Sequence, residues 1–274
     1  MSTVRQRAWD LLKPCPTIIF GPPGVGKTTL VADYPGAGIL SFGRVHNFID
    51  PKKVVRRYLF GPDGWAQFKQ DLASAAIVFK DRRTLAIDTA DAAYASCFEW
   101  FCRENKIKHP EDGAQGRNWK LLEREFQSTI LSFMSYCEQA RVHVLFVSHA
   151  RTQEVSLLSN KYSRVEPDFG AQLDRTIMRV ADYCWYLGYD VAAGRKVSSA
   201  TTPQEGARNP RKHQDLRATS TERMLIFNGG EDYRTKDHGG FLPGEIRRLP
   251  NPPFAAILDA YAEGAGITDQ KESA

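Results

Sequence analysis

A short run near the N-terminus has the residue types and spacing of a loop that binds phosphate. Gly21, Gly26, Lys27 and Thr28 match the pattern G-x-x-x-x-G-K-[ST], and an apolar run precedes them. Glycines let backbone N–H groups turn toward phosphate oxygens, Lys27 can reach the terminal phosphates, and the Thr28 hydroxyl can ligate Mg²⁺. The alternative is a glycine-rich turn that binds nothing. The predicted nucleotide-binding residues are Gly21, Pro22, Pro23, Gly24, Val25, Gly26, Lys27, Thr28 and Thr29.

A second oxygen ligand for Mg²⁺ is expected at Asp88, which follows the apolar run 84–87. A buried strand would deliver this carboxylate to the carboxyl edge of a parallel sheet, beside Thr28. There it can hold the metal ion directly or through water. The alternative is that Asp88 only caps the helix that follows it.

His149 and Ser148 follow another apolar run, 142–147, and are expected at the tip of a neighbouring strand. A polar side chain at this place can contact the γ-phosphate or the attacking water, so His149 is a candidate catalytic residue. The alternative is that both side chains only satisfy backbone groups at the end of the strand.

The elements needed to position these residues can be read from the hydrophobic pattern. Buried strands alternate with amphipathic helices, which is typical of an α/β fold with a mostly parallel sheet flanked by helices. We expect strands at 17–20, 38–42, 84–87, 142–147 and 183–187, and an antiparallel edge strand at 223–227. We expect helices at 27–33, 65–77, 92–103, 119–140, 172–180 and 253–262.

Composition narrows the classes of protein further. The 274 residues carry a net charge of +5, which permits a polyanionic partner without requiring one. No apolar run approaches the roughly 18 residues that a membrane span needs. The N-terminus lacks the apolar region of a secretory signal, and the five cysteines are scattered, as reduced thiols in a cytoplasmic protein would be. We expect one domain over 1–274, without a membrane partner.

The segment 191–221 breaks the alternation of strands and helices. It is rich in Gly, Ser, Thr and Pro, and its basic residues outnumber its acidic ones. One interpretation is a solvated, mobile loop, and the other is an arm whose basic residues contact nucleic-acid phosphates. For the second interpretation the candidate residues are Arg208, Arg211 and Lys212.

The order of these motifs resembles the phage-type RecA-like P-loop ATPases, also described as AAA-domain phage nucleotide-binding proteins. The phosphate loop is followed by an Asp-Thr strand end, a Gly-rich turn at 113–119, the Val-Ser-His strand end and the run 233–238. The resemblance covers about 14–249, with a short C-terminal helix and tail at 250–274. It implies a RecA-like core, ATP with Mg²⁺, and a self-assembling ring or filament. It also implies a role in DNA metabolism, and some members are single-strand annealing recombinases.

The resemblance also assigns roles to residues near the C-terminus. In such folds a Lys-x-Arg or Lys-x-Lys pair reaches the γ-phosphate of the neighbouring subunit, and here the pair would be Lys236 and His238. Arg234 is a possible substitute for the missing arginine. A mobile DNA-binding loop follows the fourth strand of RecA-like proteins, which indicates Arg151, Lys161 and Arg164 as candidates.

Two departures from the family pattern concern hydrolysis. The catalytic glutamate expected after the second strand is missing, because the chain reads Ser41-Phe42-Gly43-Arg44 there, and Thr89 stands where the common AAA+ pattern has glutamate. Asp91 and Glu99 are the possible substitutes for orienting the attacking water.

Three functions stay open on the sequence. The first is a phage-related ATPase for DNA recombination, annealing or repair, binding single-stranded DNA and a single-strand binding protein in the bacterial host cytoplasm. The second is a nucleotide-gated assembly module with little turnover. The third is a small-molecule kinase, which needs an arginine-rich lid over the phosphates, and the segment 191–223 could be mistaken for such a lid.

Overall fold

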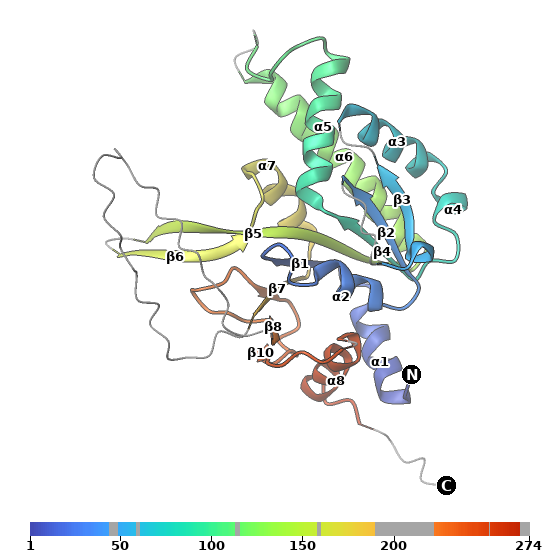
Figure 1. Ribbon diagram of the computed structural model, residues 1–274, viewed down its shortest axis with the longest axis vertical. Coiled ribbons are helices and arrows are strands. Elements are labelled where there is room, and N and C mark those ends of the chain that lie inside the picture. The colour runs from blue at the N-terminus through green and yellow to red at the C-terminus, as the bar shows by residue number, and fades with distance from the viewer. Residues whose placement is uncertain are drawn as a thin grey trace.

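The computed structural model describes residues 1–43, 49–58, 61–112, 116–157, 160–189, 222–251 and 253–268. Its centre is a sheet whose strands follow a non-sequential order (Figure 1). From one edge to the other they are β10 (Glu245–Ile246), β8 (Arg223–Ile226), β7 (Tyr183–Tyr189), β1 (Thr17–Gly21), β5 (His143–Leu157), β4 (Thr84–Asp88), β2 (Ala37–Phe42) and β3 (Val54–Tyr58).

The middle of this sheet is parallel and one side of it is antiparallel. The run from β7 through β1, β5, β4 and β2 to β3 is parallel throughout. Strands β8, β10 and β9 (Lys236–Asp237) add antiparallel pairs on the β7 side. The predicted α/β class, with a mostly parallel sheet and antiparallel edge strands, is therefore confirmed.

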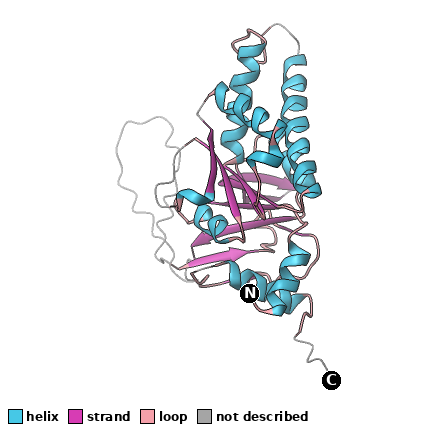
Figure 2. Ribbon diagram, turned by 90° about the vertical axis from the view of Figure 1, so that its right-hand side faces the viewer, coloured by secondary structure: helices cyan, strands magenta, loops and turns pink. Residues whose placement is uncertain are grey.

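Helices cover both faces of the sheet (Figures 1 and 2). One face packs against α3 (Pro62–Ala73), α5 (Ala90–Glu104) and α6 (Arg117–Gln139), and the other against α1 (Thr3–Leu12), α2 (Lys27–Asp33) and α8 (Phe254–Gly264). Side chains on β1 alternate between the two cores: Ile18 and Phe20 point to the α5 face, whereas Ile19 points to the α2 face. Both cores are apolar because a parallel sheet is buried on both sides.

The structure corrects the expected elements at three places. The predicted helix 65–77 is interrupted at Ser74, which ends α3 and begins the short helix α4 (Ala75–Val78). The predicted helix 172–180 is a short α7 (Ala171–Leu173) followed by a π-helical turn, Asp174–Met178. Helix α1, strand β3 and the 3-10 turn Pro51–Lys53 were not predicted.

The third correction concerns the expected DNA-binding loop after the fourth strand. Strand β5 does not end at residue 147 but continues to Leu157 and pairs with β6 (Asn160–Pro167) as an antiparallel hairpin. Figure 1 shows this β5–β6 hairpin projecting from the body of the molecule. The hairpin was missed because residues such as Thr152, Gln153 and Glu154 are polar on both faces, which removes the alternation that signals a strand.

The register of the strands brings three predicted positions to the same edge of the sheet. Gly21 at the end of β1 lies opposite His149 on β5, and Asp88 at the end of β4 lies opposite Val147 on β5. In parallel α/β sheets ligands bind outside the carboxyl ends of the strands. Within the described residues, no helix combines the length and the apolar character that a membrane crossing requires.

Candidate nucleotide site

The phosphate loop connects β1 to α2, as the spacing predicts. Its glycines meet two physical requirements. Gly24 and Gly26 have φ angles of +77° and +98°, which side-chain-bearing residues rarely adopt. A Cβ on Gly21 would lie 2.0 Å from the Leu187 carbonyl oxygen, so only glycine lets β1 approach β7 at this point.

Lys27 is buried at the start of α2, and its ammonium faces the loop itself. Nζ donates to the carbonyl oxygens of Gly21 at 2.8 Å and of Pro22 at 2.9 Å. Burial lowers the pKa of Lys27 to about 8, while the charges of Asp88 and Asp91 oppose that shift. The ammonium is therefore held within the loop, between backbone carbonyls and two carboxylates.

Thr28 and Asp88 meet as the metal-site prediction requires. The Thr28 hydroxyl donates to Asp88 Oδ2 at 2.8 Å, and both residues are buried. The helix cap on α5 comes instead from the Thr89 hydroxyl, which accepts from the Ala92 N–H at 3.4 Å. Asp88 is therefore not needed as a cap.

The donor set fits magnesium. A hydroxyl and a carboxylate offer hard oxygen ligands, and Mg²⁺ is usually held by one or two such groups together with phosphates and water. Among the described residues, no group of three or more His, Cys, Asp or Glu side chains is placed to hold a metal ion. The pair Thr28 and Asp88 would hold the ion only with help from a phosphate, which suits a metal that arrives with its nucleotide.

A histidine–carboxylate pair lies beside Lys27 and Asp88. His149 Nδ1 is 3.2 Å from Asp91 Oδ2, and Asp91 also influences the pKa of Lys27. Asp91 Oδ1 is buried and has no hydrogen-bond partner among the described residues. Buried carboxylate oxygens normally accept a hydrogen bond, so this atom has the capacity to accept one from a bound water. Ser148 is buried and donates to the His149 carbonyl oxygen at 3.0 Å.

Two other acidic or basic candidates lie away from this pair. Glu99 is about two turns further along α5 than Asp91 and lies beside Gly61, where an added Cβ would be 3.2 Å from Glu99 Oε2. Lys236 pairs with Cys184 near the amino end of β7 and donates to the Ala181 carbonyl oxygen. Lys236 therefore does not line the phosphate loop of its own chain, and its predicted role toward a neighbouring subunit stays a prediction.

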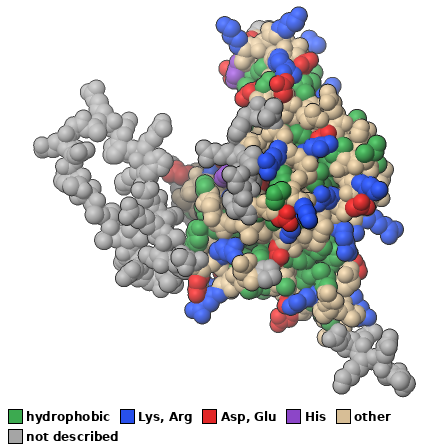
Figure 3. Space-filling model, turned by 45° about the vertical axis from the view of Figure 1, so that its right-hand side comes forward, with side chains coloured by type: hydrophobic (Ala, Val, Ile, Leu, Met, Phe, Trp, Pro, Cys, Tyr) green, Lys and Arg blue, Asp and Glu red, His purple; other side chains and the backbone are tan. Residues whose placement is uncertain are grey.

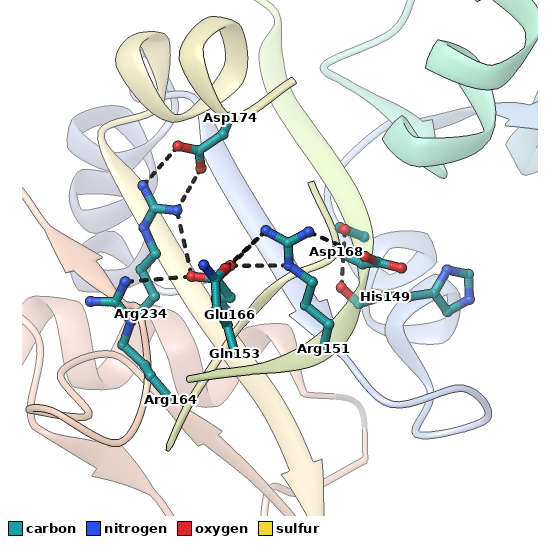
Figure 4. A network of polar contacts seen from close by, with 9 residues as sticks. His149, Arg151, Gln153, Arg164, Glu166, Asp168, Asp174 and Arg234 are labelled. Atoms are coloured by element: carbon teal, nitrogen blue, oxygen red, sulfur yellow. Dashed lines mark hydrogen bonds and ion pairs between the residues drawn. The ribbon is translucent and has the colours of Figure 1, made fainter. Parts of the chain in front are cut away.

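The candidate DNA residues on the hairpin belong to an internal ion-pair network (Figure 4). Glu166, whose side chain is 2% exposed, is 2.7 Å from Arg151, 3.4 Å from Arg164 and 3.8 Å from Arg234. Arg234 also forms a bidentate pair with Asp174 at 2.6 and 3.0 Å. Arg151, Arg164 and Arg234 are therefore partly neutralised, and none of them is a free surface cation.

Several predicted positions lie outside the described residues. These are the basic residues Arg208, Arg211 and Lys212, residues 113–115 of the glycine-rich turn at 113–119, and Arg44 after β2. Lys161 lies on β6, but its side chain is also outside the described part. Their role as DNA contacts stays a prediction.

The family follows from a comparison with known protein families. Residues 13–238 match a family described as an AAA domain, a stretch that includes the phosphate loop, Asp88 and His149. The chain belongs to the AAA domain family. This membership supports a nucleotide-binding P-loop ATPase domain, which typically uses Mg²⁺. No curated protein matches the chain in a sequence comparison.

One basic side chain at this AAA domain's phosphate loop was missed at the sequence level. Arg223, the first residue of β8, lies against Gly26. In the sequence Arg223 only adds to the positive charge that follows the segment 191–221. No local pattern signals that an antiparallel strand will return it to the loop.

Proposed function

We propose that this AAA domain is an ATP-hydrolysing, RecA-like protein that acts on DNA in recombination, single-strand annealing or repair. The observation that carries the proposal is the convergence of Lys27, Thr28 and Asp88 at one end of the sheet, with the Asp91–His149 pair beside them. Charge neutralisation, metal ligation and orientation of water are the three tasks that ATP hydrolysis requires.

Each side chain has one task in the proposed reaction. Water attacks the γ-phosphorus, and the bond between that phosphorus and the bridging oxygen of ADP breaks. Lys27 neutralises charge on the terminal phosphates when its ammonium leaves the Gly21 and Pro22 carbonyls. Thr28 and Asp88 would hold Mg²⁺, which supplies further positive charge to the phosphates. Asp91 orients the water through its free oxygen, while His149 fixes the carboxylate in place.

The proposed DNA role rests on other observations than the nucleotide site. The resemblance to phage-type RecA-like ATPases, the net charge of +5 and the projecting β5–β6 hairpin favour it. The face shown in Figure 3 carries Lys and Arg interspersed with Asp and Glu, without a broad basic patch. We propose that the DNA contacts come from the hairpin or from Arg208, Arg211 and Lys212, and that assembly of several subunits multiplies them.

The decisive experiment measures ATP turnover of the purified protein with and without single-stranded DNA. Lys27→Ala is the control, because it removes the ammonium from the phosphate loop. We expect Mg²⁺-dependent turnover that rises with DNA and is lost in Lys27→Ala. Transfer of labelled phosphate to a nucleotide or sugar, instead of release as phosphate, would replace this proposal with a small-molecule kinase.

A nucleotide-gated assembly module is the second candidate. It is favoured by the end of β2, where Ser41, Phe42 and Gly43 provide no carboxylate. ATP binding without turnover in either condition, together with assembly that depends on Lys27, would support this candidate over hydrolysis. Size-exclusion chromatography in ATP and in ADP measures that assembly directly.

A further inference from the structure

An arginine from the antiparallel side of the sheet lies on the phosphate loop. A Cβ added to Gly26 would be 2.8 Å from Arg223 Nη1, so the guanidinium occupies the space directly beside the loop. Strands β7 and β8 bring it there, because Arg223, the first residue of β8, pairs with Tyr189, the last residue of β7. The Tyr189 hydroxyl in turn donates to the Gly24 carbonyl oxygen at 3.3 Å. Two side chains of the β7–β8 pair therefore contact the loop.

The Arg223 guanidinium has the charge and the donors to bind a phosphate. No hydrogen bond or ion pair of this group is found within the described residues, unlike the guanidinium groups of Arg151 and Arg234. The adjacent acid, Glu222, is 3.0 Å from Arg248. Arginine carries a fixed positive charge and five N–H donors in a planar fork, which matches phosphate oxygens.

The order of the strands separates Arg223 from the metal ligands. Asp88 ends β4, which lies beyond β5 on one side of β1, whereas Arg223 begins β8, which lies beyond β7 on the other side. The Thr28–Asp88 pair marks the end of the loop at which the metal-bound terminal phosphates belong. A nucleotide whose terminal phosphates lie beside Thr28 and Asp88, and which extends across the loop toward β8, places the phosphate nearest its nucleoside beside Arg223.

We propose that Arg223 binds the phosphate of ATP and ADP nearest the nucleoside, while Tyr189 holds the loop at Gly24 in the conformation that presents it. The inference rests on the proposed nucleotide-binding function and adds a same-chain binding residue on the side opposite Asp88. Because ADP keeps this phosphate, Arg223 contributes equally to the binding of ATP and of ADP. It therefore sets nucleotide affinity and does not sense the γ-phosphate.

The test is the binding of ADP and of ATP to Arg223→Gln, measured by isothermal titration calorimetry with Mg²⁺. A charge-assisted hydrogen bond suggests that both affinities fall by about tenfold or more, by the same factor. Arg7→Gln is the matched control, because it removes the same charge from the exposed face of α1, at the opposite end of β1. Its affinities should equal those of the wild type.

Three results would overturn the inference. Wild-type affinity of Arg223→Gln for both nucleotides would show that the guanidinium makes no phosphate contact. Loss of ATP affinity with unchanged ADP affinity would place Arg223 at the γ-phosphate instead. A wild-type chain that binds neither nucleotide would remove the proposed function itself, and so is distinguishable from the first two results.

A second variant separates binding from folding. Arg223 is half-buried and its carbonyl oxygen accepts from the Leu249 N–H at 2.7 Å, so the strand must stay in place. Arg223→Lys keeps the positive charge and the aliphatic part of the side chain but loses the planar guanidinium. We expect its affinities for ATP and ADP to lie between those of the wild type and Arg223→Gln. Equal affinity of the Lys and Gln variants, with equal thermal unfolding of all three nucleotide-free proteins, would refute a role for the charge.

Discussion

At the scale of single residues, Lys27 makes nucleotide binding depend on pH. Burial holds its pKa at about 8, below the ordinary value of 10.5, so the ammonium is lost above pH 8 in the nucleotide-free protein. Phosphate oxygens favour the charged form and raise the pKa of Lys27 in the complex. ATP affinity should therefore be constant below pH 8 and weaken as the pH rises above it, by up to about tenfold per unit.

The same shift has a defined sign for stability. Below pH 8 the buried ammonium is charged in both the folded and the unfolded chain, and its burial destabilises the nucleotide-free protein. Between pH 8 and 10.5 the folded chain loses the proton first, so this destabilisation shrinks as the pH rises.

Calorimetry of ATP binding at pH 7 and pH 9, in buffers of different ionisation enthalpy, tests the pKa of Lys27 and should show uptake of a proton only at pH 9. Equal proton uptake at both values would contradict the assignment.

Asp91 and Glu99 can be separated by matched substitutions. Asp91 lies beside Lys27 and His149, whereas Glu99 lies further along α5 near Gly61. We expect Asp91→Asn to lower kcat by about 10²- to 10³-fold with little change in ADP affinity, because it keeps the size but loses the charge that orients water. Glu99→Gln should keep wild-type turnover. The reverse pattern in a single-turnover assay would move the water-orienting role to Glu99.

At the scale of elements, the β5–β6 hairpin depends on one buried carboxylate. Glu166 compensates Arg151, Arg164 and Arg234, so Glu166→Gln leaves three guanidinium groups with less negative charge around them. We expect a loss of about 2–3 kcal/mol in the free energy of unfolding, because removing one partner of a buried ion pair is strongly destabilising. Urea denaturation measures this change. Glu154→Gln, on the exposed part of β5, is the control and should have no measurable effect.

The elements also show what the sequence can and cannot predict. Strands that are buried on both faces, such as β1 and β4, can be recognised in the sequence as apolar runs. The residues that end these strands, Gly21 and Asp88, lie at the site. The hairpin β5–β6 gives no such signal because both its faces are polar. Contacts such as Thr28 with Asp88 follow from strand order and could be anticipated. Contacts such as Arg223 with Gly26 need an antiparallel return that no local pattern encodes.

At the scale of the whole molecule, the remaining question is where DNA would bind. The hairpin arginines Arg151 and Arg164 are paired with Glu166, which makes the segment containing Arg208, Arg211 and Lys212 the stronger candidate for phosphate contacts. Each phosphate contact adds about 0.7 unit to the slope of log affinity for single-stranded DNA against log salt concentration.

Replacing Arg208, Arg211 and Lys212 together with Gln should therefore weaken binding to single-stranded DNA and reduce that slope by about two units per chain. The control replaces three exposed basic residues of α1 and α6 with Gln, which matches the change in net charge without touching the segment; these are Arg7, Lys120 and Arg124. Fluorescence anisotropy at several salt concentrations measures both slopes. If the two triple variants lose affinity equally, DNA responds to net charge alone, and the segment is not a DNA-binding arm.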